Sequence, residues 1–275
     1  MPSIITATDF SEVSLNAAHY ACGIASAQNA EVVVLHSFVI PVMFSDIPMP
    51  TSLINDTQDD AELQMKKLVA DLTTSYPDVT ITGKVFYGDT VDIINEYTSE
   101  NNTPWLVVIG NNNDGEHGTW PDSTLSDALK KLKYPVLAIP SGMAYRNPSN
   151  ICFAFDNIPE KNDTALGQLM NITLQLKAQL HVVNIKVTIG ADTEEDIDGQ
   201  AKNMLAAVSP IYHFISVVTD IDGAISTFVS GNNIDWLVMI PRKHSFFEGL
   251  FHKSHTTSIA HHAKIPILAL HEFNG

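Results

Sequence analysis

The sequence predicts an α/β protein of two tandem doubly wound domains, each a five-stranded parallel sheet with helices on both faces. Three observations predict this fold class. The chain has 275 residues, more than the usual length of one domain. Short apolar runs, typical of strands buried on both faces, alternate with helix-length amphipathic stretches. The whole pattern then occurs a second time, which indicates an internal duplication.

Similar strands mark the two copies. The first strand of each copy is apolar and ends in aspartate, and the second carries a Leu-His dipeptide. A tryptophan begins the fourth strand and a proline begins the closing strand, with the same spacing in both copies. In this order, the features are Asp9 and Asp156, Leu35-His36 and Leu180-His181, Trp105 and Trp236, and Pro135 and Pro266.

Stretches with helical periodicity lie between the strands. In the first copy they predict helices at 14–28, 58–74, 91–101 and 123–131, with a third strand near 80–86. In the second copy they predict helices at 164–179, 194–208, 223–231 and 254–262. Strands that alternate with crossover helices are typical of a parallel doubly wound sheet.

The two copies differ in length between the second and fourth strands. The first copy has a proline-rich insertion near 41–56, and its prolines should exclude regular helix. The segment 141–150 is polar and contains Gly142 and Pro148, and it predicts a linker at 144–150. We therefore expect one domain at 1–143 and a second at 151–275.

The charge of the chain argues against several classes of partner. The 31 acidic and 15 basic residues give a formal net charge of -16, so most of the surface should repel nucleic acid and anionic membranes. A basic leader and an apolar span of about 20 residues are both absent from the sequence, and we expect a cytoplasmic protein. Cys22 and Cys152 fall in different copies, which favours buried free thiols over a disulfide.

Polar residues follow the first and fourth strands of copy one, where open parallel sheets bind ligands. Asp9 ends the first strand, and a loop at 110–124 opens onto a helix whose N-terminus would favour phosphate. With the Leu-His and closing strands, which recur in both copies, these features resemble the universal stress protein family over nearly the whole chain. The resemblance implies a Rossmann-like, adenine-nucleotide α hydrolase-like fold and a stress-response regulatory or binding protein that is not an enzyme.

The resemblance also implies a site in copy one for ATP or another adenine nucleotide. Asp9 would meet the ribose or adenine, and the backbone near His36 and Ser37 would flank the base. Four loop residues would face the phosphates. They are Gly110, Asn113, Ser123 and Thr124. These positions keep the G-x2-G-x9-G-[ST] spacing of the ATP-binding members, with two of the three glycines replaced, and copy two keeps none of the glycines.

The charge of this loop bears on the choice of nucleotide. Its sequence contains Asp114, Glu116 and Asp122 and lacks Lys and Arg. These carboxylates oppose a triphosphate unless a metal intervenes. A nucleoside or AMP therefore fits copy one better than ATP does.

Two other functions remain open. The lost glycines and an aromatic-rich loop at 246–251 favour a protein-interaction scaffold that needs no ligand. A weak ATPase would require a metal-held water near Asp9, Asp114 or Asp122. We expect no catalytic residue, because the sequence lacks a nucleophile motif and a full P-loop, and no metal site. A basic loop at 242–255 could bind an anion or pack against the other domain.

The resemblance implies that the two domains pack face to face through the closing strands, as an intramolecular pseudo-dimer. A homodimer and an unidentified protein partner are both compatible with the sequence. We expect neither nucleic acid nor a membrane as a partner. The insertion is apolar near 43–49, so it could serve as a lid over the copy-one site or as an interface.

Overall fold

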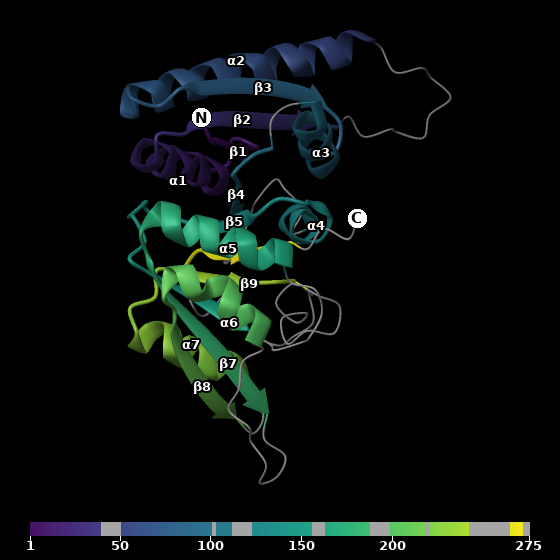
Figure 1. Cartoon of the computed structure of the whole chain (residues 1–275). Coiled ribbons are helices and arrows are strands. Elements are labelled where there is room, and N and C mark those ends of the chain that lie inside the picture. Colours follow the sequence, from purple (N-terminus) through teal and green to yellow (C-terminus); the bar gives the residue numbers. More distant parts are fainter. Residues whose placement is uncertain are drawn as a thin grey trace, which may run out of the picture. The chain divides into compact units, whose positions relative to one another are not determined.

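The computed structural model describes residues 1–39, 51–100, 103–111, 123–155, 163–187, 199–217, 221–241 and 265–271. The chain divides into two compact units (Figure 1). The first unit comprises residues 1–132 and 141–145, and the second comprises residues 133–140 and 146–275. Helices and mostly parallel strands build both units, so the predicted α/β fold class is confirmed.

Four parallel strands form the sheet of the first unit. They are β1 (Ser3–Ala7), β2 (Glu31–Phe38), β3 (Ile81–Tyr87) and β4 (Leu106–Asn111). Their order is β3-β2-β1-β4, so the direction of winding reverses between β1 and β4. Ile4 of β1 pairs with Val32 of β2 and with Leu106 of β4, and all three side chains are buried. Strands covered on both faces explain the nearly continuous apolar runs of the sequence.

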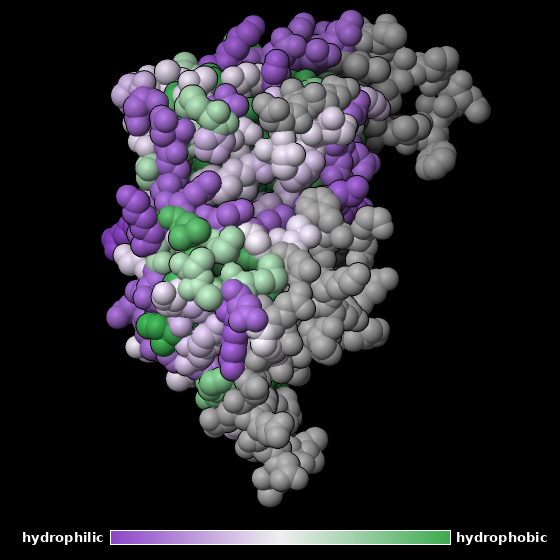
Figure 2. Space-filling view, in the orientation of Figure 1, coloured by the Kyte–Doolittle hydropathy of each residue, from purple (hydrophilic) through white to green (hydrophobic). Residues whose placement is uncertain are grey.

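The described part of the first unit has four helices. They are α1 (Glu12–Gln28), α2 (Thr51–Ser75), α3 (Thr90–Glu100) and α4 (Ser123–Lys131). Helix α2 lies along β3 (Figure 1), where Gly83 leaves room for Met65: a Cβ at Gly83 would lie 2.5 Å from Met65 Cγ. The outer face of α2 is hydrophilic (Figure 2), as the periodicity of this stretch predicts.

The start of α2 corrects one prediction. The insertion at 41–56 was expected to exclude regular helix, yet Thr51–Ser75 is a single helix. Pro50, the last proline of the insertion, directly precedes this helix in the sequence. Proline is tolerated at a helix N-terminus, because the first amides of a helix have no acceptor within it. The remainder of the insertion, and with it the predicted lid, lies outside the described residues.

The second unit contains five parallel strands in the order β10-β9-β6-β7-β8. They are β6 (Asn150–Phe155), β7 (Gln179–Val187), β8 (Ile211–Val217), β9 (Trp236–Met239) and β10 (Ile267–Ala269). Its described helices are α5 (Asp163–Leu176), α6 (Gly199–Leu205), the short 3-10 helix η1 (Ala206–Val208) and α7 (Ile221–Gly231). The helix predicted at 254–262 and the start of the one predicted at 194–208 lie outside the described residues.

The closing strand of copy one, β5 (Val136–Pro140), belongs to the second compact unit. It pairs antiparallel with β10, Ile267 opposite Ala138 and Ala269 opposite Val136. All five β5 residues are buried. The two closing strands therefore lie side by side within the second unit, and the predicted face-to-face packing of the two domains stays a prediction.

The register of the strands also corrects the match between the two Leu-His dipeptides. His36 pairs with Val85, near the carboxyl end of β2. His181 instead pairs with Ile211, the first residue of β8, and so lies near the start of β7. Val32 and Leu180 hold corresponding positions, because they pair with Ile4 and Ile151 of the two first strands. The two histidines are therefore not equivalent, and Asn184 takes the position of His36 in the second unit.

The predicted linker is anchored at its start. The Tyr145 ring packs edge-on against Tyr20 of α1, with centroids 5.2 Å apart, and covers Gly23. Cys22 and Cys152 are free and buried, as the sequence predicts, and burial raises the pKa of each thiol to about 12. Within the described parts of the chain, no helix is both long and apolar enough to cross a membrane.

Candidate functional site

The turn between β1 and α1 is held by its own side chains. Asp9 Oδ1 accepts hydrogen bonds from the amide and the hydroxyl of Ser11. Ser11 in turn caps α1, because its Oγ accepts a bond from the Ser14 amide at 3.3 Å. Thr8 Oγ1 lies 3.0 Å from Ser14 Oγ and accepts the Phe10 amide at 2.9 Å. The carboxylate predicted to meet a ligand therefore also builds the turn that starts α1.

Phe10 occupies the left-handed region of the backbone, with φ of 63°. A bulky residue pays strain energy in this conformation, so the surrounding hydrogen bonds must hold it there. The conformation places the Phe10 ring 4.5 Å from the imidazole of His36. Phe38 stacks at 6.5 Å from His36, and Tyr87 of β3 lies 5.7 Å from Phe38. We call Phe10, His36, Phe38 and Tyr87 the aromatic cluster.

His36 has a defined tautomer. Its Nδ1 lies 2.7 Å from the carbonyl oxygen of Thr8, and a carbonyl can only accept, so Nδ1 carries the proton. Burial lowers the pKa of His36, while its bond to Thr8 and the charge of Asp9 act in the opposite direction. The imidazole is therefore neutral near pH 7, and Nε2 is a hydrogen-bond acceptor.

Ser37 points to the opposite face of the sheet from His36, because successive side chains of a strand alternate. Its hydroxyl lies 2.7 Å from Thr90 Oγ1 at the start of α3. Asp89 caps the same helix by accepting the Val91 amide at 2.9 Å. The Ser37 side chain thus fixes α3 to β2, and only its backbone remains available to flank a base.

Gly110, near the end of β4, lies beside the first turn of α1. A Cβ at Gly110 would lie 2.8 Å from the Val13 carbonyl oxygen, too close for any other residue without a shift of the backbone. Because Thr6 pairs with Val108, the register brings Gly110 next to Thr8 and the β1–α1 turn. The glycine predicted to approach a phosphate is thus also required by packing.

The structure brings together part of the predicted site. Asp9, Gly110 and the end of β2 meet at the carboxyl edge of the sheet, on both sides of the point where the strand order reverses. Thr124 lies in the first turn of α4 and is half-buried. Asn113 lies outside the described residues, and Ser123 is described by its backbone alone. The role of these loop residues toward a phosphate therefore stays a prediction.

Sequence reasoning missed the aromatic cluster. Phe10 directly follows the predicted aspartate, Phe38 follows the predicted Ser37, and Tyr87 ends β3. A signal was present, because three successive strands of the sheet each end close to an aromatic residue. Because parallel strands end at the same edge of a sheet, these rings are expected to lie close together.

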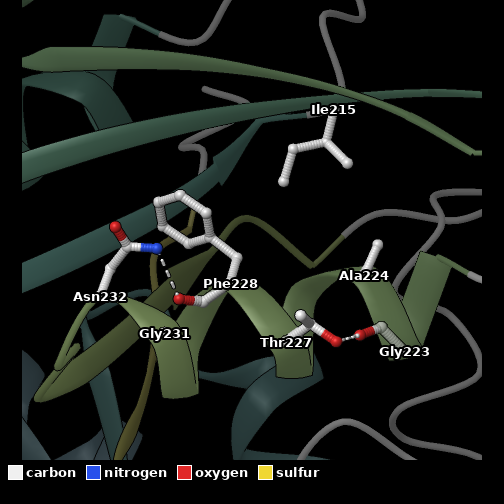
Figure 3. A pocket seen from close by; sticks show the side chains of 7 residues that line it. All are labelled: Ile215, Gly223, Ala224, Thr227, Phe228, Gly231 and Asn232. Atoms are coloured by element: carbon white, nitrogen blue, oxygen red, sulfur yellow. Dashed lines mark hydrogen bonds between the residues drawn. The ribbon is translucent and has the colours of Figure 1, made fainter.

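The second unit does not show a matching site in its described residues. Asp156 and the basic loop at 242–255 lie outside them. An open groove of about 580 Å³ lies between β8 and α7 (Figure 3). Its polar groups bond within α7: the Thr227 hydroxyl donates to the Gly223 carbonyl, and the Asn232 amide donates to the Phe228 carbonyl. In the described ranges, no three His, Cys, Asp or Glu side chains are placed to hold a metal ion.

Comparisons with known proteins agree with this fold. The model of the universal stress protein family matches residues 1–140 and again residues 148–271. No curated protein matches the sequence. A universal stress protein from Archaeoglobus fulgidus DSM 4304 has a TM-score of 0.71 at 17% identity, with 98% of each chain covered.

Two other solved structures are less similar. A functionally unknown protein from Pseudomonas aeruginosa PAO1 has a TM-score of 0.50 at 15% identity, over 98% of this chain and 92% of its own. A universal stress protein in complex with cAMP matches 51% of this chain and 98% of its own at 19% identity, with a TM-score of 0.38. At such identities the likeness is one of fold.

Proposed function

The chain belongs to the universal stress protein family, and we propose that it is a stress-response binding protein whose first unit holds an adenine nucleotide of low charge, AMP or the nucleoside adenosine. The observation that carries the proposal is the meeting of Asp9, Gly110 and the aromatic cluster at the carboxyl edge of the first sheet. Planar apolar rings beside a few fixed polar groups are typical of sites for small planar ligands.

Each part of this edge suits one part of such a ligand. The Phe10 ring offers a flat surface to a purine, and a base–aromatic contact of this kind is worth roughly 1–3 kcal/mol. Asp9 supplies a carboxylate that can accept the ribose hydroxyls. The close approach of β4 to α1 at Gly110 leaves the backbone near the site unobstructed by a side chain.

Charge decides between AMP and ATP. Asp9 lies at this edge, Asp89 caps α3 near the end of β2, and the loop that follows β4 adds three carboxylates in sequence without a Lys or Arg. A triphosphate would meet repulsion from all of them, whereas a nucleoside would meet none. We therefore expect affinity to fall from adenosine and AMP to ADP and ATP, and magnesium to reduce the difference.

The test is calorimetric titration with adenosine, AMP, ADP and ATP, with and without magnesium. Asp9→Asn is the informative variant, because asparagine keeps an oxygen that can accept the Ser11 bonds, removes the charge and replaces the second acceptor oxygen by an amide that donates. We expect weaker binding of uncharged adenosine, whose ribose hydroxyls lose the carboxylate acceptor, with little change in thermal stability. Asp156→Asn, the sequence counterpart in copy two, is the control and should bind like the parent. Absence of heat with all four ligands at millimolar concentration would contradict the proposal.

One observation favours a second candidate, a protein-interaction scaffold that needs no ligand. Asp9 and Gly110 both have structural roles: Asp9 holds the turn before α1, and Gly110 leaves room for α1. Mass spectrometry of small molecules released from the freshly purified, denatured protein separates the candidates, since a scaffold releases no adenine compound. An ATPase activity has less support, because the described residues contain no group of three His, Cys, Asp or Glu side chains placed to hold a metal ion; Asp114 and Asp122 lie outside them.

Location, protein partner and oligomeric state are further proposals. We propose a cytoplasmic location, an unidentified protein partner, and a homodimer or an intramolecular pseudo-dimer built on the closing strands. Antiparallel pairing of β5 with β10 supports the last of these. Sedimentation at several concentrations would separate a monomer from a homodimer.

A further inference from the structure

Two histidines of the second unit form a direct hydrogen bond. His181 Nδ1 on β7 lies 3.1 Å from His213 Nε2 on β8. The rings are nearly parallel, at 13°, and their centroids are 5.3 Å apart. The distance between the ring centroids exceeds the distance from His181 Nδ1 to His213 Nε2 by about one ring diameter. The two imidazoles therefore lie end to end along the hydrogen bond. One nitrogen donates and the other accepts, which is the arrangement of two neutral histidines.

Helix α7 packs on this histidine pair. The Phe228 ring of α7 lies edge-on to both imidazoles, 4.6 Å from His213 and 6.3 Å from His181, each at 65°. His181 is only 8% exposed. The pair thus sits inside the contact between the edge of the sheet and its helix.

The rest of this contact is loosely packed. The groove of Figure 3 runs between Ile215 of β8 and the small residues Gly223, Ala224 and Gly231 of α7. Helix α3 holds the corresponding place in the first unit and has the same length, with buried Ile93 at the position of Ala224. Ile225 and Val229 of α7 are buried as well, and the contact of Phe228 with the histidines is a part of the attachment of α7 that a change of pH can alter.

We propose that the His181–His213 pair is an acid-sensitive contact that holds α7 on β8 at neutral pH and releases it when both imidazoles are protonated. The first added proton makes an imidazolium that can still donate to its neutral partner. The second proton leaves a hydrogen on each facing nitrogen, so the bond has no acceptor and two positive charges lie side by side. The Phe228 ring, which packs against both imidazoles, then lies beside the two charges.

The described surroundings of the pair do not neutralise these charges. On β6, the register partner of His181 is Cys152, whose buried thiol stays protonated. Lys202 of α6 acts on Tyr212, whose side chain points to the other face of β8, because strand neighbours alternate. From α7 the described side chain at the pair is Phe228. Among the described residues no carboxylate affects the pKa of either histidine.

The direction of the pH effect follows from the pKa shifts. Burial lowers the pKa of both imidazoles, and the charge of His213 lowers that of His181 further. With α7 released, both groups return toward the ordinary value of about 6.5. The released state therefore binds more protons, and the attachment of α7 is complete above about pH 6.5 and is lost as the pH falls toward the lowered values.

The test is hydrogen exchange of the whole chain, followed by mass spectrometry, at about pH 7.5 and about pH 5. In a His36→Gln background, which removes the pH response of the first unit through that residue, exchange of α7 is divided by that of α3, so the intrinsic effect of pH on exchange cancels. We expect the opening equilibrium of α7 relative to α3 to rise by about tenfold or more on acidification, since up to two protons are taken up. In His213→Asn, which keeps an amide to bond His181 but cannot be charged, the rise should shrink markedly.

His19→Asn is the control, because His19 is exposed on α1 of the first unit and should leave the ratio unchanged. Equal loss of protection in both units on acidification would overturn the proposal, as would an identical pH response of the parent and His213→Asn. If His213→Asn fails to fold, NMR titration of the parent decides: the two imidazoles must titrate as a coupled pair, together with the resonances of α7. Independent titration without a response from α7 would also overturn it.

Discussion

At the scale of single residues, several family positions serve the fold and the candidate site at once. Asp9 holds the turn before α1, His36 bonds the Thr8 carbonyl, and Gly110 admits the backbone of Val13. A suitable substitution can keep the role of a residue in the fold and remove its role toward a ligand. The Asp9→Asn experiment uses this property. Substitutions of Gly110 and His36 test the structural roles of those two residues.

Gly110→Ala should destabilise the first unit. The added Cβ would lie 2.8 Å from the Val13 carbonyl, and backbone cannot give way as a flexible side chain can. We expect a loss of about 1–3 kcal/mol in the free energy of unfolding, the range for overpacking. Urea denaturation measures it. Gly167→Ala in α5 is the matched control, because a Cβ there meets open space; it should be neutral or stabilising by up to about 1 kcal/mol.

His36 should make the stability of the first unit depend on pH. Burial is the main influence on its pKa and lowers it, so the unfolded chain binds the proton more tightly. The contribution of neutral His36 is complete above the ordinary pKa of about 6.5 and is lost as the pH falls. Denaturation of the parent and of His36→Gln at pH values above and below that point measures the effect. A parallel response of the two proteins would rule it out.

At the scale of elements, capping and close packing explain where the helices begin and where the linker starts. Ser11 and Asp89 cap α1 and α3 with side-chain oxygens. Tyr145, expected in a free linker, is fixed on α1 because Gly23 leaves a surface on which its ring can lie. Burial raises the pKa of Tyr145 to about 12, in agreement with a ring removed from water.

Gly23→Ala should therefore dislodge Tyr145. The new Cβ would lie 2.6 Å from Tyr145 Cδ1, so the ring must move, although alanine favours the helix by about 1 kcal/mol. We expect net destabilisation in the parent and net stabilisation in a Tyr145→Ala background. A double-mutant cycle by thermal unfolding measures this coupling. Additive effects would show that the two residues do not interact.

At the scale of the whole molecule, the compact units do not coincide with the two sequence copies. The strand β5 ends copy one in sequence but packs with the second unit and pairs with β10. A strand that loses its neighbour exposes unpaired backbone groups, and such edges promote aggregation.

A fragment of residues 133–275 should therefore be more soluble and more stable than one of residues 151–275, the predicted second domain. In the longer fragment β10 keeps its partner along Val136–Ala138, whereas the shorter one exposes the edge of β10. Light scattering and thermal unfolding of the two fragments measure the difference. Equal behaviour would show that β5 contributes little to the second unit.

The sequence by itself determined the fold class, the duplication and most of the elements. Apolar runs such as Leu106–Ile109 must be buried on both faces. The alternation of strand and helix periodicity along the chain is compatible with few fold classes other than α/β. It also placed Asp9 and Gly110 at one edge, because parallel strands end together.

Only the tertiary structure decided the register, the partner of β5 and the side-chain contacts. Two Leu-His dipeptides look alike in sequence, but pairing puts His36 at the candidate site and His181 at the far end of its strand, beside His213. The aromatic cluster and the histidine pair each join residues from different strands. Such contacts depend on which strands are neighbours and how they are aligned, and local periodicity carries no information about either.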